Sequence, residues 1–184
     1  MRDTITLGLK LAFITAISAL VLGFTNQITA PKILEAEIKT NQEARLAVLP
    51  NAENFESVDV VDNENIIEVY VGKSGDSISG YTIKSKSNGF GGKLEILTGI
   101  SSDGEITGMK VLKHTETPGL GANAEKDSFQ SKFVGKNSTD KVQINKLEPQ
   151  KDSEVQAITG ATITSKAVAL AVNESLNYFE ENLK

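Results

Sequence analysis

The chain has 184 residues, of which 39% are hydrophobic, and this length suits one globular domain with an appendage. It carries 19 basic and 24 acidic residues, and the net charge of -5 offers no footprint for nucleic acid, so we expect no nucleic-acid partner. The absence of cysteine excludes disulfides, iron-sulfur clusters and cysteine-linked cofactors, and the single histidine, His114, gives no basis for a metal cluster.

The N-terminal segment is almost wholly apolar from residue 11 to residue 24. Counted outward through Leu7 and Ile28, it reaches about 20 residues, the length of a membrane-spanning helix. We therefore expect a single transmembrane anchor over residues 1–30. A cleaved signal peptide, with residues 28–30 as a weak processing site, and a buried soluble helix are the two alternatives.

The charges that flank this segment predict its orientation. Arg2 and Lys10 precede the apolar core, whereas residues 25–31 on its far side carry no charge. By the positive-inside rule the N-terminus lies in the cytoplasm and the remaining chain lies outside the cell membrane. Residues 31–50 alternate apolar and charged side chains, which predicts an amphipathic helical connector, and residues 51–184 would form the extracytoplasmic domain.

Short apolar runs separated by polar turns predict a mainly antiparallel sheet. Residues 58–61 and 66–71 read as a hairpin around the turn at 62–65, and further strands are expected at 79–85, 93–100 and 106–113. One short edge strand is expected within residues 137–152, and the apolar spacing of residues 167–182 predicts a helix. The expected fold class is α+β, with a sheet packed against helices.

Two loops between these elements contain several glycines. Residues 88–92 read Asn-Gly-Phe-Gly-Gly and can let a backbone or a ligand approach closely, although a flexible loop has the same composition. Residues 115–121 read Thr-Glu-Thr-Pro-Gly-Leu-Gly, a turn that can simply end a strand. His114 precedes this turn, and we expect it to cap or pack beside the strand end.

Residues 159–166 place four hydroxyl side chains and a glycine at the start of the C-terminal helix. Free backbone N-H groups and the positive end of the helix dipole meet there, which suits a phosphate group. From spacing alone, a hydroxyl side chain that merely caps the helix, with a turn glycine before it, is the more common explanation of such a cluster.

The run Thr-Gly-Ala-Thr-x-Thr-Ser at 159–165, the loop at 116–121 and the preceding Gly-Phe-Gly-Gly together resemble the FMN-binding domain family. This family includes the G subunit of Rnf complexes and the C subunit of sodium-pumping NADH:quinone reductases. The resemblance implies covalent FMN, joined through its phosphate to Thr162. An acidic residue normally precedes the motif, and either Asp152 or Glu154 could fill that position.

The same resemblance assigns further contacts to the cofactor. Residues 116–121 would help to form the flavin pocket, and the motif hydroxyls would cap the helix or contact the phosphate. The flavin contacts so implied, besides Thr162, are Thr159, Gly160, Ala161, Thr164, Ser165, Glu116, Thr117, Pro118, Gly119, Leu120 and Gly121.

The resemblance also implies a role and partners. The chain would relay electrons within a membrane-bound Rnf complex, which couples ferredoxin oxidation and NAD reduction to sodium or proton movement. Other membrane and iron-sulfur subunits would be its neighbours, and a separate flavin transferase would attach FMN from FAD. The alternatives are the C subunit of a sodium-pumping quinone reductase and an anchored extracytoplasmic module that binds a phosphate-bearing ligand.

Overall fold

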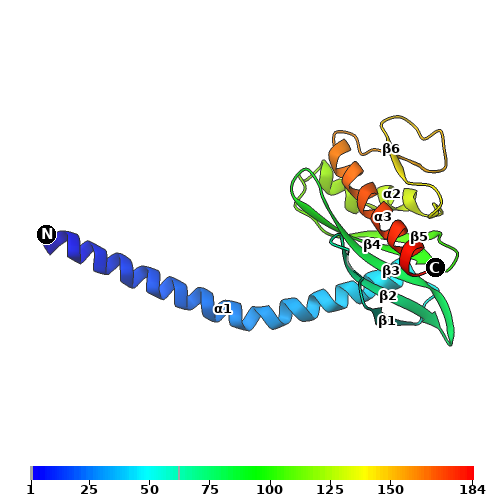
Figure 1. Ribbon diagram of the computed structural model, residues 1–184. Helices are drawn as coiled ribbons and strands as arrows, with labels where there is room; N and C mark the ends of the chain where they lie inside the picture. Colours follow the sequence, from blue (N-terminus) through cyan, green and yellow to red (C-terminus); the bar gives the residue numbers. More distant parts are fainter. Residues whose placement is uncertain (1, 62) are drawn as a thin grey trace. The chain divides into compact units, whose positions relative to one another are not determined.

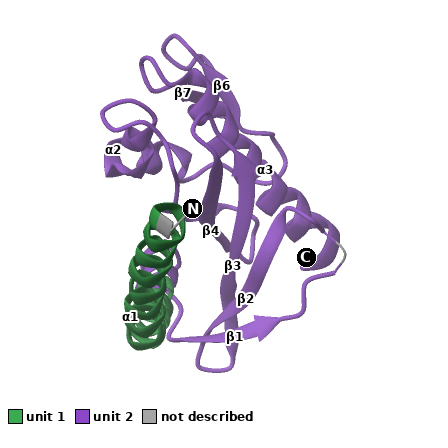
Figure 2. Cartoon of the chain, turned by 90° about the vertical axis from the view of Figure 1, so that its left-hand side faces the viewer, with its two compact units in different colours: residues 1–42 green, residues 43–184 purple. Residues whose placement is uncertain are grey.

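The computed structural model describes residues 2–61 and 63–184. Met1 and Asp62, the latter part of the predicted turn, lie outside the described residues, as does the side chain of Arg2. The chain divides into two compact units, residues 1–42 and residues 43–184 (Figure 2).

The first unit is helical throughout its described residues. Helix α1 (Arg2–Val48) continues through Pro31 and extends beyond this unit. Its large apolar side chains between residues 5 and 24 are 46–73% exposed, so a buried soluble helix is wrong. Within the described part of the chain, α1 is the one helix long and apolar enough to cross a membrane. It is thus consistent with a single-pass anchor.

Residues 31–48 are helical, as expected, but they continue the same helix rather than forming a separate connector. Pro31 removes one backbone donor, and the turns on either side maintain the helix. The last turn of α1 belongs to the second unit, where Ala44, Val48 and the following Leu49 are buried.

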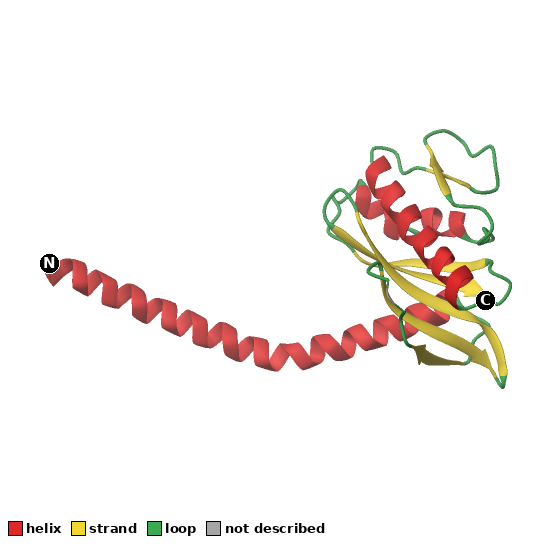
Figure 3. Cartoon of the chain, viewed as in Figure 1, coloured by secondary structure: helices red, strands yellow, loops and turns green. Residues whose placement is uncertain are grey.

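The second unit is built on a five-stranded antiparallel sheet whose strands follow one another in chain order (Figure 3). The strands are β1 (Asn54–Val58), β2 (Ile66–Ser74), β3 (Ser77–Asn88), β4 (Lys93–Ser101) and β5 (Ile106–Lys113). The predicted sheet and its last three strands are confirmed. The first hairpin is confirmed with a corrected strand: β1 ends at Val58, which pairs with Val69, and Val60 packs on the core outside any strand.

Helix α3 (Thr162–Asn182) covers one face of this sheet (Figure 1). Fully buried side chains of α3, such as Val168, Val172 and Phe179, pack against Ile83 and Ile96 of β3 and β4. Helix α3 is amphipathic and buries one face against the sheet, whereas the middle of β4 is buried on both of its faces. The predicted helix is confirmed, and it begins five residues earlier than its apolar spacing indicates.

The opposite face of the sheet receives the last turn of α1. Gly99 and Gly108 leave room for it, because an added Cβ at Gly99 would lie 2.2 Å from the carbonyl oxygen of Val48. Thr107 Oγ1 donates a hydrogen bond to that same oxygen at 2.5 Å. Arg45 stacks over the Tyr70 ring at 3.6 Å. These contacts fix the helix end on the sheet.

The remaining elements lie between β5 and α3 in the chain. They are η1 (Gly121–Glu125), α2 (Asp127–Gln130), η2 (Ser131–Phe133), β6 (Gln143–Asn145) and β7 (Glu154–Gln156). Strand β6 is the short strand expected within residues 137–152, but it does not edge the main sheet. It pairs in parallel with β7, which the sequence analysis missed, to form a separate two-stranded sheet.

Candidate functional site

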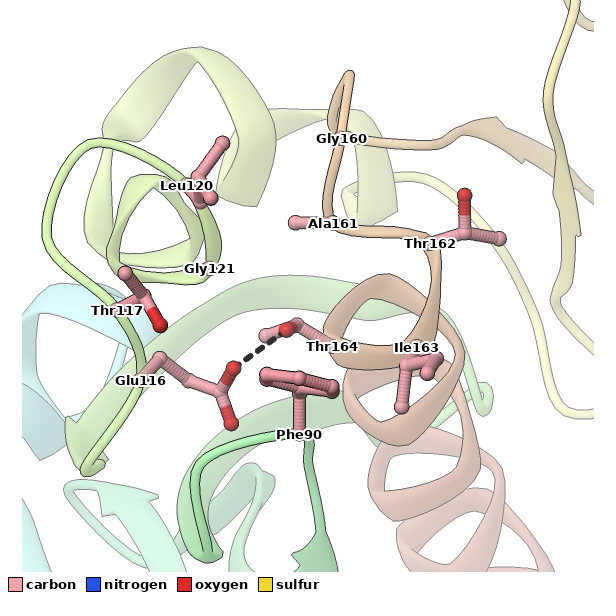
Figure 4. Close-up of a pocket in the computed structure, with 10 residues that line it drawn as sticks. All are labelled: Phe90, Glu116, Thr117, Leu120, Gly121, Gly160, Ala161, Thr162, Ile163 and Thr164. Atoms are coloured by element: carbon pink, nitrogen blue, oxygen red, sulfur yellow. Dashed lines mark hydrogen bonds between the residues drawn. The ribbon is translucent and has the colours of Figure 1, made fainter.

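A cavity of about 380 Å³ lies at the N-terminal end of α3. Three segments far apart in the sequence form its walls: the glycine-rich loop after β3, the loop after β5, and the turn that leads into α3 (Figure 4). The lining residues are Phe90, Glu116, Thr117, Leu120, Gly121, Gly160, Ala161, Thr162, Ile163 and Thr164. Its volume lies in the range of small-molecule and cofactor sites.

Helix α3 opens on this cavity without a capping side chain. Ala161 occupies the N-cap position and makes no side-chain cap hydrogen bond, and Thr162 is the first helical residue. The interpretation of Thr162 as a mere N-cap is therefore wrong. The backbone N-H groups of the first turn have no partner inside the helix, and with the positive end of the helix dipole they suit an anion.

The hydroxyl of Thr162 remains available at the rim of the cavity. Its side chain is half-buried and points away from the pair formed by Glu116 and Thr164 (Figure 4). Gly160 precedes it with a φ of 77°, a left-handed conformation that favours glycine. This turn brings the chain sharply into the helix and presents Thr162 beside the cavity.

The hydroxyl of Ser165 stabilises the same turn rather than capping the helix. Ser165 Oγ accepts a hydrogen bond from the Ile158 N-H at 2.9 Å and donates one to the Ala161 carbonyl, also at 2.9 Å. The side chain is fully buried. Since no side chain caps α3, the expected capping by Thr159, Thr164 or Ser165 is wrong.

Glu116 connects the three walls of the cavity. One carboxylate oxygen accepts the hydroxyl hydrogen of Thr164 at 2.6 Å, and the other accepts the backbone N-H of Gly91 at 2.9 Å. Glu116 is 6% exposed and Thr164 is 1% exposed. A single buried carboxylate thus joins its own loop to the glycine-rich loop and to the first turn of α3.

Glycines permit this close approach. An added Cβ at Gly89 would lie 2.2 Å from Glu116 Oε1, and one at Gly91 would lie 2.2 Å from the Thr115 carbonyl oxygen. Thr115 Oγ1 also donates to the Gly91 carbonyl at 2.9 Å. The glycine-rich loop is therefore packed against the loop after β5 and is not a free surface loop.

His114 lies just after β5, as expected for a residue at a strand end. Its Nδ1 accepts the backbone N-H of Glu116 at 3.1 Å, and its Nε2 lies 2.9 Å from a carboxylate oxygen of Glu125. The imidazole therefore orients the backbone that carries Glu116, and it is not among the lining residues of the cavity.

Apolar side chains form the outer wall of the cavity. Phe90 is 70% exposed, Ile163 is 56% exposed and Leu120 is 46% exposed. These side chains leave apolar area in water beside a hollow of the right size for a cofactor, which favours a flat, largely apolar ligand.

Most of the expected flavin contacts meet at this cavity, and some do not. Of the residues implied by the resemblance, Thr162, Gly160, Ala161, Thr164, Glu116, Thr117, Leu120 and Gly121 line it, whereas Thr159, Pro118, Gly119 and Ser165 do not. Neither candidate for the upstream acidic position lines it: the backbone carbonyl of Asp152 accepts from Lys136, and Glu154 accepts from Asn145 and Gln150.

Two lining residues were missed as site residues by the sequence analysis, Phe90 and Ile163. The sequence did contain an indication for Phe90: it is an aromatic residue between glycines, and such a side chain on a closely packed turn faces outward, where it can contact a ligand. There was none for Ile163, because an apolar residue in the first turn of a helix normally belongs to the core.

Comparisons with known proteins agree with this geometry. Residues 89–177 match the FMN-binding domain family, and this range contains all three segments that line the cavity. The chain is 43% identical to the G subunit of the Na(+)-translocating ferredoxin:NAD(+) oxidoreductase complex of Acetobacterium woodii, over 95% of this chain and 90% of the relative. It is 32% identical to the proton-translocating counterpart of Clostridium ljungdahlii, over 87% and 83%.

Solved structures give the same fold. The C subunit of the Na(+)-translocating NADH-quinone reductase from Parabacteroides distasonis aligns with a TM-score of 0.54 and 29% identity, over 62% of this chain and 61% of that one. NqrC of Shewanella oneidensis aligns with a TM-score of 0.54 and 19% identity, over 71% and 69%. The resemblance found in the motifs is thus confirmed. The chain belongs to the family of G subunits of ion-translocating ferredoxin:NAD(+) oxidoreductase complexes, and it carries an FMN-binding domain.

Proposed function

We propose that this chain is a membrane-anchored electron-transfer subunit of an Rnf-type complex, with FMN held covalently through its phosphate on Thr162. The observation that carries the proposal is the accessible Thr162 hydroxyl on the uncapped first turn of α3, beside a cavity of about 380 Å³. When bound, FMN would supply one- and two-electron redox chemistry.

The residues around the cavity fit that cofactor. The first-turn N-H groups of α3 would neutralise part of the phosphate charge at the attachment point. Phe90, Leu120 and Ile163 offer apolar surface to the ring system, and their exposed area beside the cavity supports this role. No lysine or arginine is among the described residues that line the cavity, so the helix end is the positive element for the phosphate.

Attachment would require an enzyme from outside the chain. The Thr162 oxygen would form a bond to the phosphorus on the FMN side of FAD, the phosphoanhydride bond would break, and AMP would leave. Among the described lining residues the one possible base is Glu116, and it is already bonded to Thr164 while Thr162 points away from it (Figure 4). A flavin transferase therefore supplies the base that takes the hydroxyl proton.

The family and the apolar N-terminal helix support the wider role that we propose. The two G-subunit relatives are 43% and 32% identical to this chain, whereas the two solved C-subunit structures are 29% and 19% identical, which favours an Rnf-type complex over a quinone reductase. The chain would pass electrons between neighbouring membrane and iron-sulfur subunits. Residues 1–30 would cross the cell membrane, with the N-terminus in the cytoplasm and the flavin domain outside.

The test is intact-protein and peptide mass spectrometry of the full chain co-expressed with a flavin transferase. We expect the mass of FMN less one water on the peptide that contains Thr162, and in-gel flavin fluorescence after denaturation. Thr162→Ala removes both signals, whereas Thr162→Ser keeps them. Thr159→Ala is the matched control, because this neighbouring hydroxyl does not line the cavity. Flavin that persists on Thr162→Ala, or an unmodified wild-type peptide, contradicts the assignment.

A further inference from the structure

The cavity contains one side chain with a formal charge, the carboxylate of Glu116, among ten described lining residues. We propose that this carboxylate sets the reduction potential of the flavin, lowering it by opposing the negative charge that reduction brings into the cavity. The proposal rests on the proposed function, since it requires FMN to occupy this site.

The hydrogen bonds around Glu116 are those of an ionised carboxylate. Both of its oxygens accept, one from the Thr164 hydroxyl at 2.6 Å and one from the Gly91 N-H at 2.9 Å. An ionised carboxylate only accepts, whereas a protonated one needs an acceptor for its own hydrogen. The Gly91 N-H can only donate, and the Thr164 hydroxyl donates to the other oxygen, so both oxygens are placed as those of a carboxylate.

None of the ion pairs seen among the described residues includes this carboxylate. Among the described residues no lysine, arginine or histidine nitrogen lies within salt-bridge distance of Glu116. The nearby His114 directs Nε2 to Glu125, and its Nδ1 accepts the backbone N-H of Glu116. Charges that are buried and unpaired are poorly screened, so they act strongly on a neighbouring group.

The positive end of α3 is the competing influence, and it is the weaker one. A helix N-terminus acts as about half an elementary charge, and the phosphate ester on Thr162 would be its direct partner. Glu116 carries a full charge, is 6% exposed, and sits in the wall shared with Phe90 and Leu120. We therefore expect a negative net electrostatic potential in the cavity, and such a potential would disfavour the addition of electrons to a flavin bound there.

Glu116 also orders the cavity, and this second role can be separated from its charge. A glutamine at this position has nearly the same shape and lacks the negative charge. Its carbonyl oxygen can still accept from Thr164, but its amide nitrogen cannot accept from the Gly91 N-H, so it loses one hydrogen bond together with the charge. The variant Thr164→Val does the opposite, because it removes the hydrogen bond and leaves the carboxylate. The two substitutions therefore distinguish a field effect from an ordering effect.

The experiment is a redox titration of the full-length, covalently flavinylated protein, followed by its flavin absorption. We expect Glu116→Gln to shift the potential to a more positive value, and Thr164→Val to shift it less. Asp103→Asn is the control for charge: this carboxylate is exposed in the turn between β4 and β5 and does not line the cavity, so the potential stays at the wild-type value. An unchanged or more negative potential in Glu116→Gln overturns the proposal, as does an equal shift in Thr164→Val.

A second variant decides the question if Glu116→Gln carries no flavin. Thr117→Lys adds an opposite charge at an exposed lining position without altering the carboxylate. A positive shift supports the proposal, and an unchanged potential overturns it. Failure of the proposed function can be told apart from failure of this inference. In the first case, the wild-type protein would carry no FMN mass on the peptide that contains Thr162.

Discussion

Gly121 is the residue at which one added methyl group should break the cavity wall. A Cβ built there lies 2.4 Å from Glu116 Oε2 and 2.7 Å from Thr164 Oγ1, the two atoms that share the 2.6 Å hydrogen bond. Real Cβ atoms do not approach other atoms so closely. Gly121 has no positive φ, so the backbone itself accepts alanine, and the effect of Gly121→Ala comes from this contact alone.

The expected loss of stability comes from the Glu116 carboxylate and the Thr164 hydroxyl, which the added methyl group would force apart. A hydrogen bond to a charged group contributes about 1.5–3 kcal/mol, and overpacking a buried site costs about 1–3 kcal/mol. We therefore expect Gly121→Ala to lower the free energy of unfolding of residues 43–184 by roughly 3–5 kcal/mol. For a unit of this size that is about 10–15 °C in Tm.

The assay is thermal unfolding of the full chain in one detergent, by calorimetry and circular dichroism. Gly119→Ala is the matched control, because Gly119 has a φ of 79° and nothing lies within 4 Å of an added Cβ. Its left-handed backbone costs about 1–2 kcal/mol. A loss below about 3 °C in Gly121→Ala, or equal losses in the two variants, would refute the reasoning.

Two further predictions concern pH and topology. Hydrogen bonds from the Gln150 N-H and the Asn145 amide hold the pKa of Glu154 below its ordinary value. The stability that Glu154 contributes is therefore fully present when the pH is above the ordinary pKa, and it is lost as the pH falls through the folded-state pKa. The Tm difference between wild type and Glu154→Gln should thus shrink on acidification, and a constant difference contradicts this. Because the chain has no cysteine, Ser77→Cys and Thr4→Cys each give a protein with one thiol. A membrane-impermeant maleimide added to intact cells should label only Ser77→Cys. Labelling of Thr4→Cys alone would contradict the proposed orientation.

Local patterns in the sequence predicted the strands well where two runs flank a short turn. Strand β5 has the predicted bounds and β4 differs by one residue, because Ile100 pairs with Ile106 across the tight turn at Gly104. Strands β6 and β7 have three residues each and pair in parallel across an intervening loop. A three-residue run has no measurable alternation, so β7 could not be predicted.

The start of α3 shows what apolar spacing leaves out. Threonine and serine have modest helix propensity, and the apolar repeat begins only at residue 167. Tertiary contacts hold the first turn instead, since Ser165 bonds to Ile158 and Thr164 bonds to Glu116. Glu116 and Thr164 are 48 positions apart. The motifs could indicate both residues, but only the fold shows that they meet.

The direction of Thr162 is determined by the sheet as much as by the motif. Ser87 Oγ donates to the carbonyl of Ala167 and Ser85 Oγ donates to that of Ala171, each at 2.8 Å. These carbonyls are one helical turn apart on one face of α3, so the two bonds fix the rotation of the helix about its axis. A slip of one residue would turn the first-turn side chains by about 100° and move Thr162 from the cavity rim. Two serines of β3, outside the attachment motif, therefore position the hydroxyl on which the proposed flavin linkage depends.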